Sequence, residues 1–249
     1  MAIINFGVGQ LWGRRTDISN PTPVQFGVLQ EVQISFDRTL KELMGQYQFA
    51  VDVAASGTKI VGSAKSADIT ANKFNDLFLG GTITPASGIQ DVANESHAAA
   101  ASVTIAPPGS GTFSKDLGVI LQSTSIPLTR VASAPTVGQY SVTEPGGVYT
   151  FNAGQTGTLL ISYEYTVTNL VTIPISNPLQ GFSPSFEIHL QESYTSTAGI
   201  VNTLQFKLNA CKSNKFDFNF KNQDHTIPDF AFQAFADSSN NIGTLTFIG

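Results

Sequence analysis

Hydrophobic and polar residues alternate along most of this chain of 249 residues. Within residues 32–36, for example, Val32, Ile34 and Phe36 fall on one side and the polar residues on the other. The same period of two recurs in residues 47–53, 159–167, 204–208, 216–220, 230–232 and 245–247. Such a period is typical of strands with one buried face and one more polar face. It predicts an all-β protein whose antiparallel sheets pack as a sandwich or barrel.

One segment, residues 66–81, follows a helical period instead. Thr70 is the expected N-cap, with Asp68 as the alternative, because both side chains can accept hydrogen bonds from the first helical N–H groups. Gly80 can adopt the left-handed conformation that ends many helices. The sequence therefore predicts one short helix of about ten residues, which needs packing to hold it.

The two faces of this helix have different expected roles. One face carries, at helical spacing, Ala71, Phe74, Leu77 and Phe78. This apolar stripe should pack on a sheet surface or on the end of a sandwich. The opposite face carries Asn72, Lys73, Asn75 and Asp76. We expect this polar face to be available to a neighbouring molecule.

Turn-forming residues separate the alternating segments, at 80–81, 107–109, 145–147, 154–157 and 238–241. Residues 83–112 are the least patterned part of the chain, and they predict a long loop region with one short strand at 102–106. No internal repeat, heptad pattern or Pro- and Gly-rich linker divides the sequence. A single domain over residues 1–249 is therefore expected.

Charged residues are scarce, at 12% of the chain against about 25% in ordinary soluble domains. Because charge is depleted in interface cores, this composition favours an assembly subunit. The alternative is an ordinary extracellular or viral β protein. The net charge of -5 argues against a protein that grips nucleic-acid phosphates. No signal-peptide pattern and no apolar run of roughly 18 residues is present, so no membrane span is expected.

Candidate chemistry is sparse. The sole cysteine, Cys211, excludes an intramolecular disulfide and favours a small buried side chain. Gly7 and Gly9 lack the further glycine, at the right spacing, of a dinucleotide-binding loop. The three histidines have no metal-ligand or triad spacing: His97, His189 and His225. No enzyme activity, metal or cofactor is expected.

The densest basic spot lies beside the only tryptophan. Arg14 and Arg15 follow Trp12 within three residues. Trp and Arg are the residue types that anchor protein interfaces, so a contact with another subunit is favoured here. The alternatives are ion pairs within the subunit and a contact with nucleic acid.

The order of several motifs resembles the tail tube (major tail) proteins of long-tailed bacteriophages. Residues 21–54 contain a Pro-rich arm, a strand, a KEL-x-G loop and a second strand, and residues 57–81 contain the next strand and the single helix. Residues 116–166 are similar to the central strands of these proteins, and residues 228–247 to their C-terminal hairpin. The likeness covers most of the chain.

This resemblance implies a structural virion protein with a β-sandwich and one flanking helix. Copies would form hexameric rings that stack into a hollow tail tube, through which phage DNA passes to the host. Its partners would be further copies of itself, the tape measure protein and other tail proteins. DNA would pass without specific binding, so we expect acidic or uncharged residues along the lumen. The protein would lie in the phage tail of the virion, after assembly in the host cytoplasm.

In such proteins the N-terminal arm, here residues 1–30, and the KEL-x-G loop typically reach adjacent subunits. The polar helix face is expected to sit between neighbouring subunits as well. Carried over to this sequence, the resemblance implies subunit contacts at Leu11, Trp12, Arg14, Arg15, Leu40, Leu43, Met44, Gln46, Asn72, Asn75 and Asp76. For the loop, the alternative is that its apolar residues pack within their own subunit.

Other functions stay open at this point. One is a β-sandwich module that binds carbohydrate or a receptor. Another is a different virion part, such as a tail terminator, a baseplate ring protein or a capsid decoration protein. A binding module would need exposed aromatic residues clustered on loops, whereas most aromatic residues here alternate within predicted strands.

Overall fold

The computed structural model describes residues 7–68, 70–195, 199 and 201–248. In this part of the chain the protein is built from antiparallel strands, apart from one parallel contact between two short strands. Besides a single 3-10 turn at Pro108–Ser110, its helical structure is confined to residues 71–79. The predicted all-β class with one short helix is thus confirmed.

The chain forms two compact units where we expected one domain. Unit 1 combines residues 1–83 with residues 173–249, and unit 2 is the intervening segment 84–172. Both crossings between the units fall at the ends of two long paired strands, since Thr84 is the register partner of Thr172. The second crossing leads into residues 173–184, which contain Pro174, Pro178, Gly181 and Pro184 and form no helix or strand.

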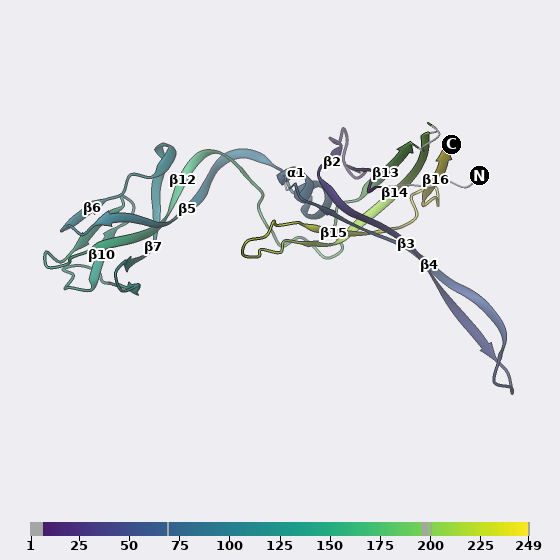
Figure 1. Cartoon of the computed structure of the whole chain (residues 1–249), viewed down its shortest axis with the longest axis horizontal. Coiled ribbons are helices and arrows are strands. Elements are labelled where there is room, and N and C mark those ends of the chain that lie inside the picture. Colours follow the sequence, from purple (N-terminus) through teal and green to yellow (C-terminus); the bar gives the residue numbers. More distant parts are fainter. Residues whose placement is uncertain (1–6, 69, 196–198, 200, 249) are drawn as a thin grey trace. The chain divides into compact units, whose positions relative to one another are not determined.

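Unit 1 is one large sheet with the order β2-β1-β13-β14-β15-β4-β3, and β16 pairs along β14. Figure 1 shows these strands together with α1, which lies near β2 and β15. The strand bounds are β1 (Gln10–Arg15), β2 (Val24–Phe26), β3 (Leu29–Met44), β4 (Ala50–Ser66), β13 (Phe186–Thr195), β14 (Val201–Asp217), β15 (Asp229–Ala234) and β16 (Gly243–Ile248).

One face of this sheet is the core of unit 1, and the helix packs on it. Leu77 from the helix is fully buried among strand residues such as Leu11, Phe186 and Ile188. The sheet makes room for Leu77 at Gly13, where an added Cβ would lie 2.9 Å from a Leu77 methyl carbon. The predicted packing role of the helix is therefore confirmed for Leu77.

Unit 2 consists of two four-stranded sheets, β5-β12-β7-β8 and β6-β11-β10-β9. Its buried side chains form a separate cluster that includes Tyr149, Leu159, Ile161 and Tyr163. The bounds are β5 (Thr84–Ala98), β6 (Ser102–Thr104), β7 (Thr112–Leu121), β8 (Ile126–Pro127), β9 (Thr129–Arg130), β10 (Gln139–Thr143), β11 (Val148–Phe151) and β12 (Thr158–Thr172).

The expected loop region at residues 83–112 is wrong for most of its length, because β5 fills residues 84–98. This strand consists mostly of small and polar residues and has no clear alternation of its own. It is held by register pairing with β12, about 70 residues further along the chain. A partner so distant in sequence overrides the weak local propensity of the segment.

A buried carboxylate ties the two sheets of unit 2 together. Asp116 on β7 accepts hydrogen bonds from the hydroxyl groups of Tyr140 (2.7 Å) and Tyr149 (2.9 Å), and Arg130 lies 3.6 Å away. Burial, together with the bond to Asp116, raises the pKa of both tyrosines above the usual value. The carboxylate and the two hydroxyl groups are therefore paired with one another inside unit 2.

Candidate assembly surfaces

Within the expected N-terminal arm, residues 1–30, two segments are strands of the unit 1 sheet, so the described part is not a free arm. Residues 10–15 form β1, which pairs with β13 on one side and β2 on the other. Leu11 is completely buried in the core of unit 1, and Trp12 is half-buried. The expectation that Leu11 contacts another subunit is therefore wrong, because its side chain packs in its own sheet. Residues 1–6 lie outside the described residues.

The two arginines make ion pairs within the chain, which was the alternative to a subunit contact. The Arg14 guanidinium lies 2.6 Å from Glu187, and Arg15 donates two hydrogen bonds to Asp17 at 2.9 and 2.8 Å. Hydrogen bonding from Arg15 holds the pKa of Asp17 below its usual value. Arg15 is buried, whereas half of the Arg14 side chain stays exposed.

The strands β3 and β4 continue as a two-stranded ribbon beyond the rest of the sheet. β15 pairs with β4 only at residues 60–65, while the β3–β4 pairing runs on to Met44 and Ala50. Figure 1 shows this ribbon leaving the other strands of unit 1. The expected loop at Leu40–Met44 is wrong, because these residues are the end of β3 and the turn comes later, at residues 45–49.

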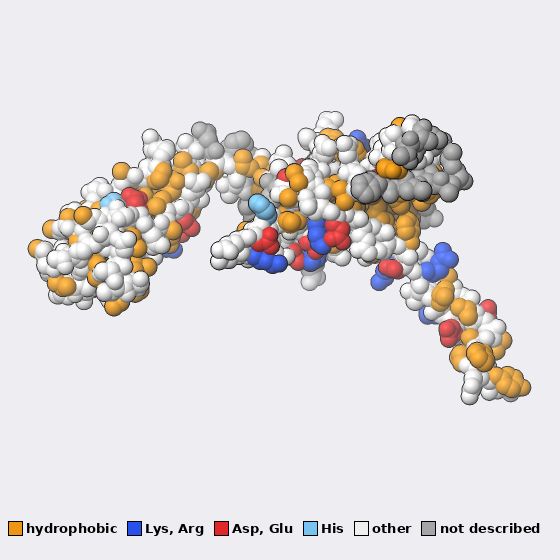
Figure 2. Space-filling view, viewed as in Figure 1, with side chains coloured by type: hydrophobic (Ala, Val, Ile, Leu, Met, Phe, Trp, Pro, Cys, Tyr) orange, Lys and Arg blue, Asp and Glu red, His pale blue; other side chains and the backbone are white. Residues whose placement is uncertain are grey.

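The ribbon, which we call the hairpin (residues 37–59), exposes its apolar side chains. The predicted contact residues Leu40, Leu43, Met44 and Gln46 all lie exposed on it, as does Val51. At its end Tyr47 is 74% and Phe49 86% exposed, and Figure 2 shows hydrophobic side chains gathered there. An isolated two-stranded hairpin is marginally stable in water. Apolar side chains left uncovered on such an element mark a contact surface.

The helix begins and ends where the sequence predicts. The side chain of Thr70 accepts a hydrogen bond from the Lys73 N–H at 3.4 Å, and Gly80 is left-handed with φ of 71°. Between these ends an α-helical turn, α1 (Ala71–Phe74), widens into a π-helical turn, η1 (Asn75–Leu79). The Gly80 N–H donates to the carbonyl of Asn75, five residues back, which closes the wider turn.

The expected polar face of the helix is only partly exposed. Lys73 and Asn75 are 3% and 2% exposed, and the Asn75 amide donates to the carbonyl of Gly81 at 2.8 Å. Asp76 is half-buried and accepts a hydrogen bond from Asn75, so only Asn72 remains exposed. The expectation of Asn75 as a subunit contact is wrong.

The apolar side of the helix joins an aromatic cluster on β14. The Phe74 ring lies 5.0 Å from the Phe216 ring and 5.6 Å from the Phe218 ring, both edge-on, and it stacks with Phe78 at 5.7 Å. Such contacts add about 0.5–1.5 kcal/mol each beyond burial. The predicted packing roles of Phe74 and Phe78 are therefore confirmed, although both rings stay half-exposed.

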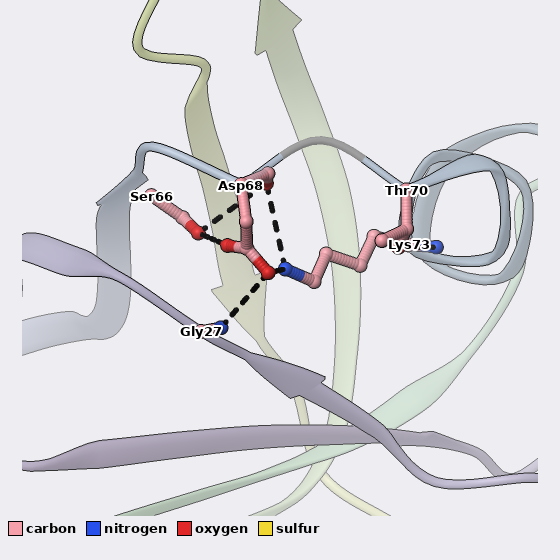
Figure 3. Close-up of polar contacts among 5 residues, drawn as sticks. All are labelled: Gly27, Ser66, Asp68, Thr70 and Lys73. Atoms are coloured by element: carbon pink, nitrogen blue, oxygen red, sulfur yellow. Dashed lines mark hydrogen bonds and ion pairs between the residues drawn. The ribbon is translucent and has the colours of Figure 1, made fainter.

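A polar cluster anchors the segment before the helix, as Figure 3 shows. The carboxylate of Asp68 accepts hydrogen bonds from the Ser66 hydroxyl, the Lys73 ammonium and the Gly27 N–H. Burial alone would raise the pKa of Asp68, but the bonds from Lys73 and Ser66 outweigh it and lower the pKa. With its acceptor and donor groups paired to one another, this cluster connects β4, the helix and the β2–β3 turn.

Unit 1 also leaves strand edges open. Among the described strands, β3 pairs only with β4, and β16 only with β14, so each has one unpaired edge. Unpaired N–H and C=O groups along a long edge are a template for pairing with another chain. In unit 2, β6, β8 and β9 are only two or three residues long, and β5 has a long edge that pairs only with β12 among the described strands.

The face of the unit 1 sheet opposite its core is polar. Three glutamines lie side by side across neighbouring strands, since Gln10 pairs with Gln191 and Gln191 with Gln205. Nearby, Glu187 is surrounded by Arg14, by His189 at 3.5 Å and by Lys207 at 3.9 Å. No described helix packs on this face.

Few groups with catalytic or metal-binding potential come together in the described residues. Burial raises the pKa of the Cys211 thiol to about 12, which makes it a poor nucleophile. Over the described ranges, no three His, Cys, Asp or Glu residues gather closely enough to hold a metal ion. No helix in that part of the chain has the length and hydropathy to cross a bilayer.

No protein-family model matches the chain, and no curated protein matches it either. The functional assignment therefore rests on the hairpin, the open strand edges and the polar face of unit 1. Sequence reasoning missed Tyr47 and Phe49 as surface residues, because their alternation with Val51 and Val53 reads as the buried face of a strand.

Proposed function

We propose that the protein is a structural subunit that assembles with identical copies into stacked rings, as in the tail tube of a long-tailed bacteriophage. The observation that carries this proposal is the hairpin, which projects from unit 1 with its apolar side chains uncovered. The hexameric symmetry of the rings, the phage tail as location, and the tape measure protein as partner come from the sequence resemblance.

The open edges of unit 1 support association with the same kind of chain. Among the described strands, all sixteen residues of β3 lie on an unpaired edge. The hairpin, which contains the second half of β3, is shielded from water only when another molecule packs on it. Charged residues of both signs on β3, such as Arg38 and Glu42, would fix the register of that contact. Unit 2, whose edge strands β6, β8 and β9 are short, would stay outside the polymerising contacts.

The polar face of unit 1 is the surface we assign to the lumen. A row of glutamines gives it hydrogen-bonding groups without charge. Several of its cations are paired: Lys65 with Glu31 at 2.5 Å, and Lys215 with Asp217 at 2.8 Å and Asp229 at 2.7 Å. Cations that already share carboxylates bind DNA phosphates weakly, so DNA would slide along such a face.

A carbohydrate-binding module is less well supported. Such a site would need exposed aromatic rings, and the described aromatic residues of unit 2 are buried, while the exposed rings Tyr47 and Phe49 of unit 1 belong to the hairpin that we assign to assembly. The buried aromatic residues of unit 2 are Phe113, Tyr140, Tyr149, Phe151, Tyr163 and Tyr165.

Negative-stain electron microscopy of the concentrated protein tests the proposal. We expect stacked rings or hollow tubes with a stain-filled channel. Isolated particles of monomer size at every concentration would contradict a tube function. Solid fibres without a channel would show association but rule out a conduit for DNA.

A further inference from the structure

Beside the helix, unit 1 has an apolar hollow of about 650 Å³. Phe78, Leu79 and Gly80 form one side, and Pro174, Leu179 and Phe182 form another. Leu179 is 89% exposed and Phe182 is more than half exposed, so the rim of the hollow is an uncovered apolar surface. None of the residues that line it is charged. Its volume is in the range of about 300–1,000 Å³ that encloses a group of a few side chains.

The same unit carries an uncharged apolar projection. Residues 45–51, at the end of the hairpin, contain no charged side chain. They begin eight residues beyond Asp37, so at about 3.4 Å per residue the hairpin end stands about 27 Å beyond the sheet. Tyr47 and Phe49 make no apolar contact that would shield them in their own chain, as their exposure shows.

We propose that the hairpin end of one copy, Tyr47 to Phe49, seats in the hollow beside the helix of a second copy. Two aromatic side chains bury roughly 150–250 Å² each when covered, which is a large gain for surfaces that are otherwise in contact with water. Because neither surface is charged, closing the contact leaves no ion without its solvation. This inference rests on the proposed function and names the residues through which copies join.

The geometry makes the contact heterologous: one copy gives its hairpin end and the other its hollow. The copy that gives its hairpin end keeps a free hollow, and the copy that gives its hollow keeps a free hairpin end, so the contact repeats in a head-to-tail series. A contact between two hairpin ends, or between two hollows, would instead stop at a dimer. An experiment that distinguishes a repeating series from a dimer therefore tests the proposed contact.

Cross-linking with a short bismaleimide detects the contact between the hairpin end of one copy and the hollow of another. The double variant carries Phe49→Cys in the hairpin end and Leu179→Cys at the rim of the hollow. Both positions are exposed, so the fold should tolerate them, and the buried Cys211 stays unreactive. We expect a ladder of dimers, trimers and larger covalent chains on a denaturing gel. Each single variant should give no ladder, because one cysteine per copy cannot propagate a chain.

The matched control combines Phe49→Cys with Val137→Cys, an aliphatic position of unit 2 that is 62% exposed. It should give no ladder. If the Phe49/Leu179 variant forms tubes as the wild type does but gives no ladder, the inference is overturned and the proposed function stands. Cross-linked dimers from Phe49→Cys alone, caused by contact between hairpin ends, would also overturn it. If the wild-type protein does not assemble at all, both proposals fail together.

Discussion

Gly80 shows how a single residue ends the helix and permits its packing. Its φ of 71° lies in the region that side chains with a Cβ rarely adopt. An added Cβ would also lie 2.7 Å from the Pro184 ring and 3.2 Å from the Phe182 ring. The sequence predicted the left-handed conformation, because glycine after an apolar helical stripe is a common signal. The close approach of Pro184 could not be predicted, since it depends on a segment a hundred residues away.

The variant Gly80→Ala should therefore destabilise unit 1 by more than about 1 kcal/mol, from backbone strain and the clash together. Chemical denaturation followed by fluorescence of Trp12 measures this change. Gly57→Ala is the matched control, because its Cβ would meet no atom within 4 Å and its φ is not positive. Equal midpoints for the two variants would contradict the role given to Gly80.

Asp68 makes the stability of unit 1 depend on pH. Its pKa is lowered in the folded protein, so the folded state binds the proton less tightly than the unfolded chain. The stabilisation is complete above the unfolded pKa of about 4 and is lost as the pH falls through the folded value. Asp68→Asn should cost roughly 2 kcal/mol at pH 7, because it removes charged hydrogen bonds.

Denaturation of wild type and Asp68→Asn at pH 7 and pH 3 checks this expectation. The difference between the two proteins should shrink at the lower pH. A difference that is the same at both pH values would show that the charge of Asp68 does not contribute.

At the scale of elements, the hairpin shows what alternation predicts and what it leaves open. The period of two places Val51 and Val53 on a strand, and β4 confirms that they belong to one. It could not reveal that this part of the strand has no second sheet layer or neighbouring strand to cover it. Coverage is a tertiary property, so apolar residues in the hairpin resemble core residues until the partner strands are known.

Removal of the hairpin should leave the rest of unit 1 nearly as stable as before. Asp37 and Lys59 are register partners, so an Asn-Gly turn can replace residues 38–58. We expect a change in the free energy of unfolding below about 1 kcal/mol, because a free hairpin adds little stability. The core variant Phe230→Ala should lose about 3–5 kcal/mol in the same assay. A comparable loss in the truncated protein would mean that the hairpin supports the fold.

At the scale of the whole molecule, the two units differ in their edges and in their expected roles. Unit 2 is continuous in sequence and has its own core, and its two ends meet at the paired residues Thr84 and Thr172. Within unit 2, alternation predicted the strand at residues 159–167, whereas the central strands over residues 116–166 were expected from the resemblance. The division into two units could not be predicted, because β5 lacks a pattern and its partner β12 is far away in sequence.

Residues 84–172 alone should fold. We expect a single cooperative unfolding transition and a near-ultraviolet circular dichroism signal from the buried tyrosines. A broad, non-cooperative melt would show that unit 2 depends on unit 1.

We expect copies of this chain to join through the hairpin of unit 1. Sedimentation velocity on the wild-type and hairpin-truncated proteins, over the same concentration series, tests this expectation most directly. We expect wild type to sediment as large species that grow with concentration, while the truncated protein stays a folded monomer. A monomeric wild type throughout the series, or a truncated protein that assembles as wild type does, would contradict it.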